Sequence, residues 1–469
     1  MKLQYVGRHA EVDLQAWLKR ANRKPLIIRG ARQTGKSTLV REFARRSNIE
    51  LVEINLEENQ TFVRKAFDEG HLIGILSALE RLTGRSLRPI ENPPILFLDE
   101  IQAVPSALQS LRYFFEQIPY LPVIAAGSTL EFILETPTFS MPVGRVEFLS
   151  LAPFTFKEFL RACRQDRLVS LIETAHPQNP ASLSLGSHAE IMHHLRNFFE
   201  IGGMPESVAI YVGDESLSAK SLSESRKLRQ SLLTAYRSDV QKYPATAHIR
   251  EVVREVFDRV SSTVSQRVKY SRLAPSRTAR DARKALALLI EAGVLLECLH
   301  THANGIPLLA EVAQETRKLF FLDVGLMMTS LGLAIDDIPS ETDERFVNEG
   351  ALAEQFVAHE LSSTFSPGDK TALTYWLREE KSRNAEVDFV IATGARIIPI
   401  EVKSGAAGTL RSLRGFCQAK SPSLAMRLDI NIPSITKLTD WSGSGADAIS
   451  FVSLPLYMAS EIKRIAKSI

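Results

Sequence analysis

The stretch LIIRGARQTGKSTL, residues 26–39, constrains the fold more than any other part of this sequence. The spacing of a P-loop, the phosphate-binding loop between a strand and a helix, is met by Gly30, Gly35, Lys36 and Ser37. A short apolar strand precedes the loop, and an amphipathic helix begins at Lys36. Glycines let backbone N–H groups close around phosphates, and the helix N-terminus adds its dipole. We therefore predict an α/β domain with a parallel sheet that binds a nucleotide and Mg²⁺.

Each residue of the loop has an expected role. Lys36 would reach the outer phosphates, and the hydroxyl of Ser37 would ligate Mg²⁺. The predicted nucleotide-binding residues are Gly30, Ala31, Arg32, Gln33, Thr34, Gly35, Lys36, Ser37 and Thr38. The alternative is a glycine turn that precedes a helix and binds nothing.

Two later apolar segments end in polar residues, as parallel strands do at a phosphate-binding edge. PPILFLDEIQ leads to Asp99 and Glu100, and LPVIAAGST leads to Ser128. We predict that Asp99 holds Mg²⁺ through water and that Glu100 orients the attacking water, which makes the protein a hydrolase. Ser128 is expected to contact the γ-phosphate or the water. Arg145 is predicted as an arginine finger or nucleotide-state contact, with an ordinary solvated arginine as the alternative.

The totals are those of an ordinary globular protein. A chain of 469 residues suggests about three domains. The net charge of +3, from 57 basic and 54 acidic residues, neither requires nor excludes nucleic acid. The three cysteines have no paired spacing, and no apolar run is long enough for a membrane span. We expect a cytoplasmic protein with no membrane partner.

Six segments carry a resemblance to a known family. They are YVGRHAEVDLQAWL, IIRGARQTGKSTL, ILFLDEIQ, VIAAGS, GRVEFLSLAPFTFKEFL and IGGMPESV. In this order they resemble the AAA-type ATPases of bacteria and archaea that carry a C-terminal uncharacterised domain. The resemblance implies an ATPase domain over residues 1–210, with Arg8 near the adenine and the GGMP stretch (202–205) closing the module. AAA-type modules often take an arginine from a neighbouring copy, so self-association is expected.

Residues 226–315 have the pattern of a helical domain with a winged helix. A helix over about 247–262 precedes a second helix that Ser276 would cap and Gly293 would end, and a strand follows. Seven basic residues stand within 18 positions: Arg267, Lys269, Arg272, Arg277, Arg280, Arg283 and Lys284. One face of the second helix carries Arg277, Arg280 and Lys284. This face is predicted either to contact DNA phosphates or to be solvated beside the ATPase.

The last third, residues 316–469, contains a hairpin with charged strands. Strands over 387–392 and 396–402 would meet at a type II′ turn, which sets Asp388 opposite Glu401. Lys403 lies two residues beyond Glu401 and shares its face of the sheet. Two carboxylates can chelate a divalent cation, and a lysine beside them can position or deprotonate a water.

KLFFLDVGL (318–326) and NEGALAEQFVAHEL (348–361) are similar to the C-terminal domain of the same ATPases, a domain related to the PD-(D/E)XK nuclease superfamily. The resemblance implies a restriction-endonuclease-like α/β domain with Mg²⁺ or Mn²⁺ bound. Glu354, in the apolar stripe of the helix before the sheet, would join Asp388 and Glu401 as a metal ligand. Asp388 follows a valine rather than the superfamily's proline, and Glu386 competes on the same face.

Two functions from different classes follow. The first is an ATP-driven DNA-processing enzyme whose C-terminal domain cuts phosphodiesters with Mg²⁺ or Mn²⁺. The second is a nucleotide-controlled switch or scaffold whose C-terminal domain binds DNA or a protein without cutting. A cross-strand Glu–Lys pair beside a spare aspartate remains the structural alternative for the hairpin.

Overall fold

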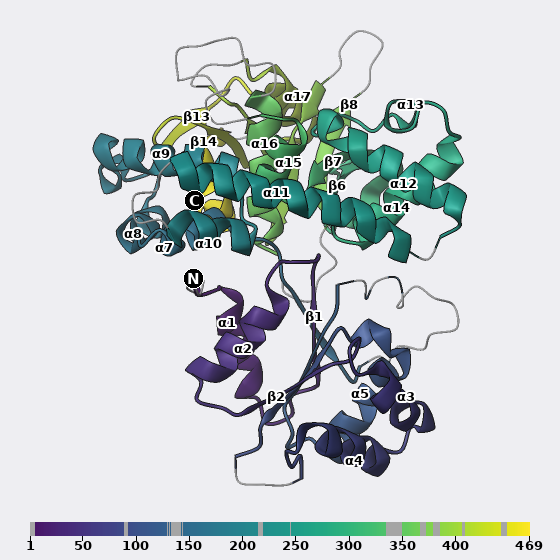
Figure 1. The fold of residues 1–469 in the computed structure, drawn as a ribbon. Coiled ribbons are helices and arrows are strands. Elements are labelled where there is room, and N and C mark those ends of the chain that lie inside the picture. Colours follow the sequence, from purple (N-terminus) through teal and green to yellow (C-terminus); the bar gives the residue numbers. More distant parts are fainter. Residues whose placement is uncertain are drawn as a thin grey trace.

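The computed structural model describes residues 5–88, 92–128, 130, 132, 142, 144–213, 219–243, 245–333, 349–365, 372–378, 385–405, 409–441 and 448–469. The first 150 or so residues form one body, and the remainder of the chain forms a second body above it (Figure 1). In the ranges given, no helix has the length and apolar character to cross a membrane.

A parallel five-stranded sheet forms the centre of the first body. Its strands are β1 (Leu26–Arg29), β2 (Leu51–Asn55), β3 (Ile95–Asp99), β4 (Val123–Ala126) and β5 (Glu147–Ser150). They lie in the order β2-β3-β4-β1-β5, and every neighbouring pair is parallel. The predicted parallel α/β domain is therefore confirmed. Because the strands are parallel, the residues that follow β1, β3 and β4 meet at one edge of the sheet.

Helices cover both faces of this sheet (Figure 1). They are α1 (Ala10–Leu18), α2 (Lys36–Arg46), α3 (Gln60–Glu69), α4 (Leu72–Thr83) and α5 (Pro105–Gln117). Leu26 and Ile28 pack with α1 and α2, whereas Ile27 packs with α3, α4 and α5. The alternation along β1 reflects the twofold period of a strand that is buried on both faces.

The next part of the chain is helical. It contains α7 (Phe156–Ala162), α8 (Asp166–Thr174), α9 (Leu185–Ile201), α10 (Pro205–Gly213) and α11 (Ala219–Asp239). The GGMP stretch turns from α9 into α10, where the Gly203 N–H donates to Asp323 at 2.5 Å. A Cβ atom at Gly203 would lie 2.1 Å from the carbonyl oxygen of Phe154, so glycine is needed for this approach. The stretch thus ties the segment after β5 to the second body.

A winged-helix order of elements follows. It comprises α12 (Ala247–Val260), α13 (Tyr270–Leu273), α14 (Ala279–Glu291), β6 (Leu295–Thr301) and β7 (Val312–Phe321). β6 and β7 form an antiparallel pair, as the two strands of a wing do. Thr278 rather than Ser276 caps α14, because its hydroxyl accepts the Asp281 N–H at 3.1 Å. Gly293, with φ of +70°, follows the helix as predicted.

β6 and β7 do not stand apart from the last third of the chain. β6 also pairs in parallel with β8 (Leu373–Arg378), which pairs with β9 (Ala385–Val387) in the sheet β7-β6-β8-β9. The domain boundary predicted between residues 315 and 316 falls inside β7 and needs correction. Long-range strand pairing, which local sequence pattern does not encode, joins the two predicted domains through one sheet.

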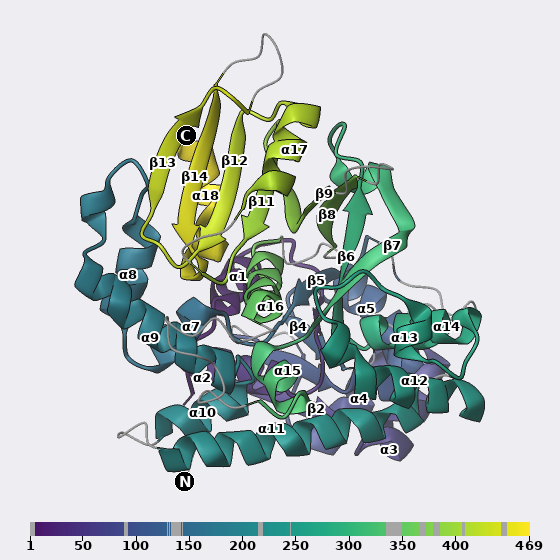
Figure 2. The same cartoon turned by 90° about the horizontal axis from the view of Figure 1, so that it is seen from above.

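A second sheet has the order β10-β11-β12-β14-β13 (Figure 2). Its strands are β10 (Phe389–Thr393), β11 (Arg396–Val402), β12 (Leu424–Asp429), β13 (Ser434–Leu438) and β14 (Ile449–Pro455). The helices of this region are α15 (Val324–Ser330), α16 (Glu349–Ser362), α17 (Arg411–Lys420) and α18 (Ile462–Ser468). α16 and α18 contribute to the hydrophobic core on one face of this sheet, and α17 to that on the other.

The hairpin of β10 and β11 has the predicted register. Phe389 pairs with Ile400 and Thr393 with Arg396, which leaves Gly394 and Ala395 as the turn. Gly394 has φ of +59°, the left-handed value that a type II′ turn needs at its first central residue. Asp388 lies between β9 and β10, where one expected strand is divided into two that pair with different neighbours.

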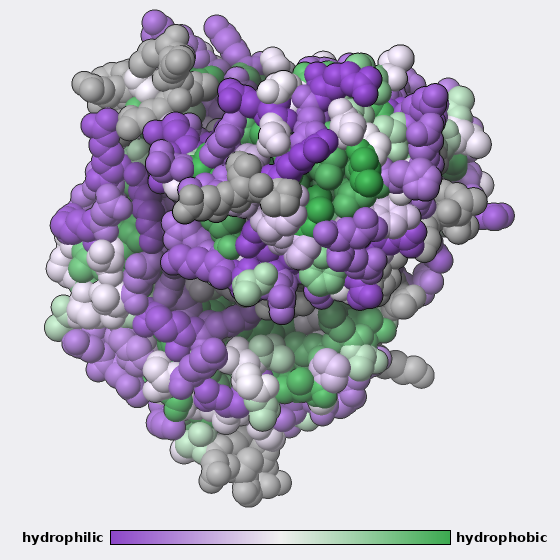
Figure 3. Space-filling model, turned by 90° about the horizontal axis from the view of Figure 1, so that it is seen from below, coloured by the Kyte–Doolittle hydropathy of each residue, from purple (hydrophilic) through white to green (hydrophobic). Residues whose placement is uncertain are grey.

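The face of the first body that points away from the second is mainly hydrophilic, and it has one hydrophobic patch toward one side (Figure 3). Large apolar side chains that reach solvent in this body include Phe62 on α3 and Ile73 on α4. Apolar side chains contribute much of the surface of ordinary proteins, so this patch identifies no partner.

Candidate functional site

The P-loop leaves β1 and enters α2 in a conformation that depends on its glycines. Gly30 and Gly35 have φ values of +147° and +88°, and Gln33 has +62°. A Cβ atom at Gly30 would lie 2.2 Å from the carbonyl oxygen of Leu151, so only glycine permits this packing. The exposed Thr38 lies in the first turn of α2. The free N–H groups of this helix end face the predicted phosphate site.

Lys36 lies in the loop and is buried. Its ammonium donates to the carbonyl oxygens of Gly30 at 3.0 Å and Ala31 at 2.8 Å. Burial lowers the pKa of Lys36 to about 8, while the negative charges of Glu100 and Asp99 act in the opposite direction. The chain's own carbonyls thus hold the cation beside the two acids that follow β3.

Ser37 and Asp99 form a donor set for a hard cation. The Ser37 hydroxyl donates to Oδ2 of Asp99 at 2.6 Å, and Oδ1 accepts the Glu100 N–H at 3.0 Å. Burial raises the pKa of Asp99, although both hydrogen bonds lower it. A hydroxyl and a carboxylate at this separation fit Mg²⁺, which takes few protein oxygens and keeps water and phosphate oxygens as its other ligands.

Glu100 and Ser128 lie at the same edge of the sheet. Glu100 has φ of +50°, a left-handed conformation that is strained for a non-glycine residue and is often found at functional sites. Its carboxylate accepts a hydrogen bond from the side-chain amide of Gln102, a residue that the sequence analysis missed. Ser128 follows β4 and is buried, and its hydroxyl has no hydrogen-bond partner within the described ranges. Such a hydroxyl is suited to a phosphate oxygen or a water.

Arg8 contacts the P-loop rather than an open adenine pocket. Its guanidinium donates to the carbonyl oxygen of Thr34 at 3.1 Å, to that of Ala152 at 2.7 Å and to Glu158 at 3.0 Å. Although burial alone would raise the pKa of Glu158, the charge of Arg8 and backbone N–H groups hold it below its usual value. These contacts support the loop from behind, and adenine contact by Arg8 stays a prediction.

The end of α11 contacts the P-loop from the second body. The Tyr236 hydroxyl donates to the carbonyl oxygen of Arg32 at 2.6 Å. The side chain of Arg32 forms an ion pair with Asp239 at 3.1 Å. The turn after α14 also approaches, since a Cβ atom at Gly293 would lie 3.4 Å from the Ala31 nitrogen. The phosphate-binding loop is therefore part of the contact between the two bodies.

Arg145 is wrongly predicted as a contact of the nucleotide site within its own chain. It precedes β5, whose Glu147 pairs with Leu26 at the start of β1, whereas the P-loop follows the end of β1. The two ends of a four-residue strand are on the order of 10 Å apart. Arg145 instead pairs with Glu116 at 2.7 Å, and both side chains are about half exposed. A role as a finger for another copy stays a prediction.

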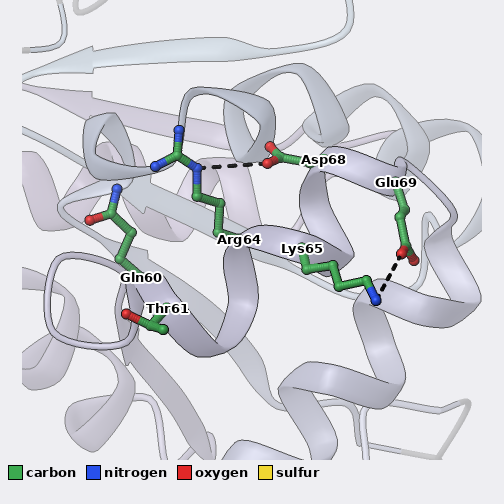
Figure 4. Close-up of a pocket in the computed structure, with 6 residues that line it drawn as sticks. All are labelled: Gln60, Thr61, Arg64, Lys65, Asp68 and Glu69. Atoms are coloured by element: carbon green, nitrogen blue, oxygen red, sulfur yellow. Dashed lines mark ion pairs between the residues drawn. The ribbon is translucent and has the colours of Figure 1, made fainter.

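A shallow surface depression lies beside α3 (Figure 4). Its lining residues are Gln60, Thr61, Arg64, Lys65, Asp68 and Glu69. Two helical ion pairs cross it, Arg64–Asp68 at 3.7 Å and Lys65–Glu69 at 3.8 Å. Such exposed pairs contribute little free energy, and the depression lies outside the phosphate-binding edge.

The predicted hairpin charges converge with Glu354 of α16. Asp388 Oδ2 accepts the Val402 N–H at 2.8 Å, and the Lys403 ammonium lies 2.7 Å from Glu401. Burial and the charge of Asp388 raise the pKa of Glu401 to about 8 and that of Glu354 to about 7. Four acids and the two lysines that contact them form one group, which we call the carboxylate cluster: Glu354, Glu386, Asp388, Glu401, Lys318 and Lys403.

Lys318 of β7 belongs to this cluster, although no motif in the sequence predicted it. The Lys318 ammonium lies 2.6 Å from Glu386, 3.3 Å from Glu354 and 3.7 Å from Asp388, and its side chain is 1% exposed. Although burial lowers the pKa of Lys318, the three carboxylates raise it well above its usual value. One signal was visible in KLFFLDVGL, where a charged residue directly precedes the four apolar residues LFFL.

The side chains of this cluster are not arranged as the predicted metal site. In the part of the chain that the structure describes, no three His, Cys, Asp or Glu side chains are arranged to hold a metal ion. The Lys318 ammonium lies between two of the three predicted ligands, Glu354 and Asp388. One oxygen of Asp388 is taken by a backbone N–H and one of Glu401 by Lys403, while the other oxygen of Glu401, Oε2, is buried without a hydrogen-bond partner among the described residues.

Comparisons with known proteins match three segments. Residues 22–160 match the model of an AAA domain. Residues 192–337 and 349–433 match two domains of unknown function, DUF8612 and DUF4143. The first segment is therefore an AAA-type P-loop ATPase module. Among proteins with curated descriptions, none matches this chain.

Three solved structures share a distant likeness. The Walker-type ATPase PABY2304 of Pyrococcus abyssi is 14% identical, with a TM-score of 0.44 over 70% of this chain and 96% of that one. Aeropyrum pernix ORC1 in complex with DNA is 15% identical, with 0.29 over 70% and 93%. The Thermotoga maritima RuvB Holliday junction branch migration motor is 17% identical, with 0.30 over 62% and 89%. Scores this low carry no argument about what this chain binds.

Replacing Lys36 with alanine tests the phosphate site. We expect the dissociation constant for MgATP to rise by about 10- to 100-fold, because a charge-assisted contact with the phosphates is lost. Titration with a fluorescent ATP analogue measures this. Arg45→Ala, on the same helix but exposed and paired with Glu42, is the control and should bind normally. Unchanged affinity in Lys36→Ala would contradict the assignment of the loop.

Replacing Glu100 with glutamine separates binding from hydrolysis. The amide keeps the size of the side chain but cannot polarise water, so we expect turnover to fall about 100-fold or more with ATP affinity retained. Phosphate release at saturating ATP measures the rate. A normal rate would remove Glu100 from the catalytic group and leave Asp99 as the only acid with an assigned role.

Proposed function

We propose that this protein is an ATP-hydrolysing switch in which the nucleotide bound at the P-loop alters the position of the second body. The observation that carries this proposal is the hydrogen bond from Tyr236 of α11 to the Arg32 carbonyl of the loop. Lys36 binds the outer phosphates, Ser37 and Asp99 hold Mg²⁺, and Glu100 orients water. Ser128 contacts the γ-phosphate or that water.

The P-loop contacts α11 through an ion pair as well as through this hydrogen bond. Arg32 belongs to the loop that surrounds the phosphates, and its partner Asp239 is largely buried. A phosphate that draws the Arg32 guanidinium away leaves Asp239 without its counter-charge, which is costly at a buried position. The position of α11 and the state of the nucleotide are therefore energetically coupled, and coupling is reciprocal.

Within the second body, α11 contacts further helices that a displacement of α11 would affect. Arg237, close to Tyr236 on α11, forms an ion pair with Asp258 of α12 at 2.9 Å. Arg229, buried in the middle of α11, donates to Thr329 of α15 at 2.9 Å. A displacement of α11 thus reaches both the winged-helix-like region and the helix before the C-terminal sheets. This supports a switch whose output lies in the second body.

DNA is the partner that the second body favours. Of its seven clustered basic residues, three are engaged by acids: Arg267 by Glu386, Arg277 by Glu255 and Arg283 by Glu315. The four others are exposed and have no carboxylate at ion-pair distance within the described ranges: Lys269, Arg272, Arg280 and Lys284. Exposed, uncompensated cations on a helix and the turn before it suit phosphate contact.

Metal-dependent DNA cleavage is the competing proposal for the C-terminal domain. The convergence of Asp388, Glu401 and Lys403 on one side of the hairpin favours it. The buried Lys318 ammonium stands against it, because a divalent cation would have to share the same carboxylates. We therefore assign the domain a binding or docking role rather than a cutting role.

The switch is tested by comparing ATP and ADP states in the Glu100→Gln chain, which keeps ATP intact. We expect amide hydrogen exchange at the end of α11 and in α12 to differ between the two nucleotides. Tyr236→Phe, which removes only the hydroxyl that reaches Arg32, should reduce this difference while ATP affinity stays within about threefold. Tyr243→Phe, at a buried tyrosine whose ring packs at a tilt against that of Phe132, is the matched control. Exchange that differs only in P-loop peptides would refute the switch.

The DNA contact is tested through its salt dependence. We expect the Arg280→Ala, Lys284→Ala double variant to bind duplex DNA more weakly and to lower the slope of log affinity against log salt by about 2. Fluorescence anisotropy across salt concentrations measures both. Arg283→Ala, on the same helix but paired with Glu315, should leave the slope nearly unchanged. An unchanged slope in the double variant would move the contact elsewhere.

A further inference from the structure

We propose that Lys318 takes the place of a divalent cation in the carboxylate cluster, so that the C-terminal domain has a closed, metal-independent charge centre. This inference concerns a site remote from the P-loop and does not depend on the proposed function. It follows from the distances and burial of the lysine and from the contacts that occupy the neighbouring carboxylates.

The Lys318 ammonium contacts two of the three predicted metal ligands, Glu354 and Asp388. It contacts carboxylates from two directions, Glu354 from α16 and the pair Glu386 and Asp388 from the segment around β9. A divalent cation binds carboxylate oxygens at about 2.0–2.6 Å, so a metal ion bound to both Glu354 and Asp388 would lie close to the ammonium that contacts them at 3.3 and 3.7 Å. The repulsion between the two cations would be large at this low exposure.

The side chain of Lys318 is held in this position by the contacts around it. Its side chain is 1% exposed, and its ammonium lies 5.2 Å from the centre of the Tyr375 ring. On the backbone, Lys318 pairs with Cys298 of β6 on one side and bridges to Arg267 on the other. A strand residue held on both sides keeps its side chain at a fixed place in the sheet.

The charges of the cluster are nearly balanced by the chain itself. Four carboxylates, Glu354, Glu386, Asp388 and Glu401, face three cations. These are Lys318, Lys403 at 2.7 Å from Glu401, and Arg267 at 3.8 Å from Glu386. Buried carboxylates need a counter-charge, and here the protein supplies it without an ion from solution.

The location gives this centre a structural use. Lys318 is on β7 of the wing-like hairpin, whereas its partners come from α16 and from the segment that leads into the C-terminal sheet. The centre therefore joins the hairpin that follows the basic helix α14 to the C-terminal sheet.

The proposal is tested by Mn²⁺ binding to the nucleotide-free full-length chain, followed by electron paramagnetic resonance. We expect the wild type to hold no stoichiometric Mn²⁺ that depends on Asp388. Lys318→Met, which keeps the stem and removes the charge, should gain a site that binds Mn²⁺ at least about tenfold more tightly. Asp388→Asn in that background should remove the gain.

Controls and a second readout keep the outcome decisive. Lys403→Met leaves Lys318 in place and should gain no site, and Mn²⁺ should raise the Tm of Lys318→Met but not that of the wild type. Should Lys318→Met fail to fold, the wild-type measurement decides alone. Wild-type Mn²⁺ binding, or metal-dependent cutting of plasmid DNA, that Asp388→Asn abolishes would overturn the proposal. A folded Lys318→Met that binds no Mn²⁺ would overturn it as well.

Discussion

Two carbonyl oxygens of the P-loop, those of Arg32 and Thr34, accept hydrogen bonds from side chains that lie far away in the sequence. Tyr236 donates to one and Arg8 to the other. A phosphate-binding loop must be preorganised, because its N–H groups have to converge on the ligand at little conformational cost. Here that preorganisation depends on an N-terminal segment and on a helix of the second body, so the loop and the domain arrangement constrain each other.

Buried charges impose a similar constraint at two other places in the molecule. An ionised group inside a protein needs a partner of opposite charge that compensates its charge, and removing one partner is strongly destabilising. The Arg8–Glu158 pair behind the P-loop and the Lys318 contacts in the C-terminal domain both follow this rule. Each joins segments that are distant in sequence, and each therefore fixes how parts of the fold meet. The second body is held to the ATPase module by the first pair and internally by the second.

The two centres differ in what they can do chemically. At the phosphate-binding edge, Ser128 has a buried hydroxyl without a partner within the described ranges, and Glu100 has a strained backbone. Groups in this condition are suited to a ligand that completes them. In the carboxylate cluster, by contrast, internal cations already meet most of the charge.

Local sequence pattern was sufficient where the physics is local. The P-loop spacing, the acids that end a buried strand and the Gly394 turn of the hairpin all depend on residues close together in the chain, and the structure has the strand-to-helix loop, the strand end and the turn at those positions. The tertiary structure alone decided the rest. It put Arg145 at the far edge of the sheet, joined β6 to β8 across the expected domain boundary, brought Tyr236 to Arg32 and set Lys318 among three carboxylates. These contacts arise between segments that meet only when the chain has folded, because spacing along a sequence determines the shape of a turn or a helix face but not which distant side chain will come to lie against it.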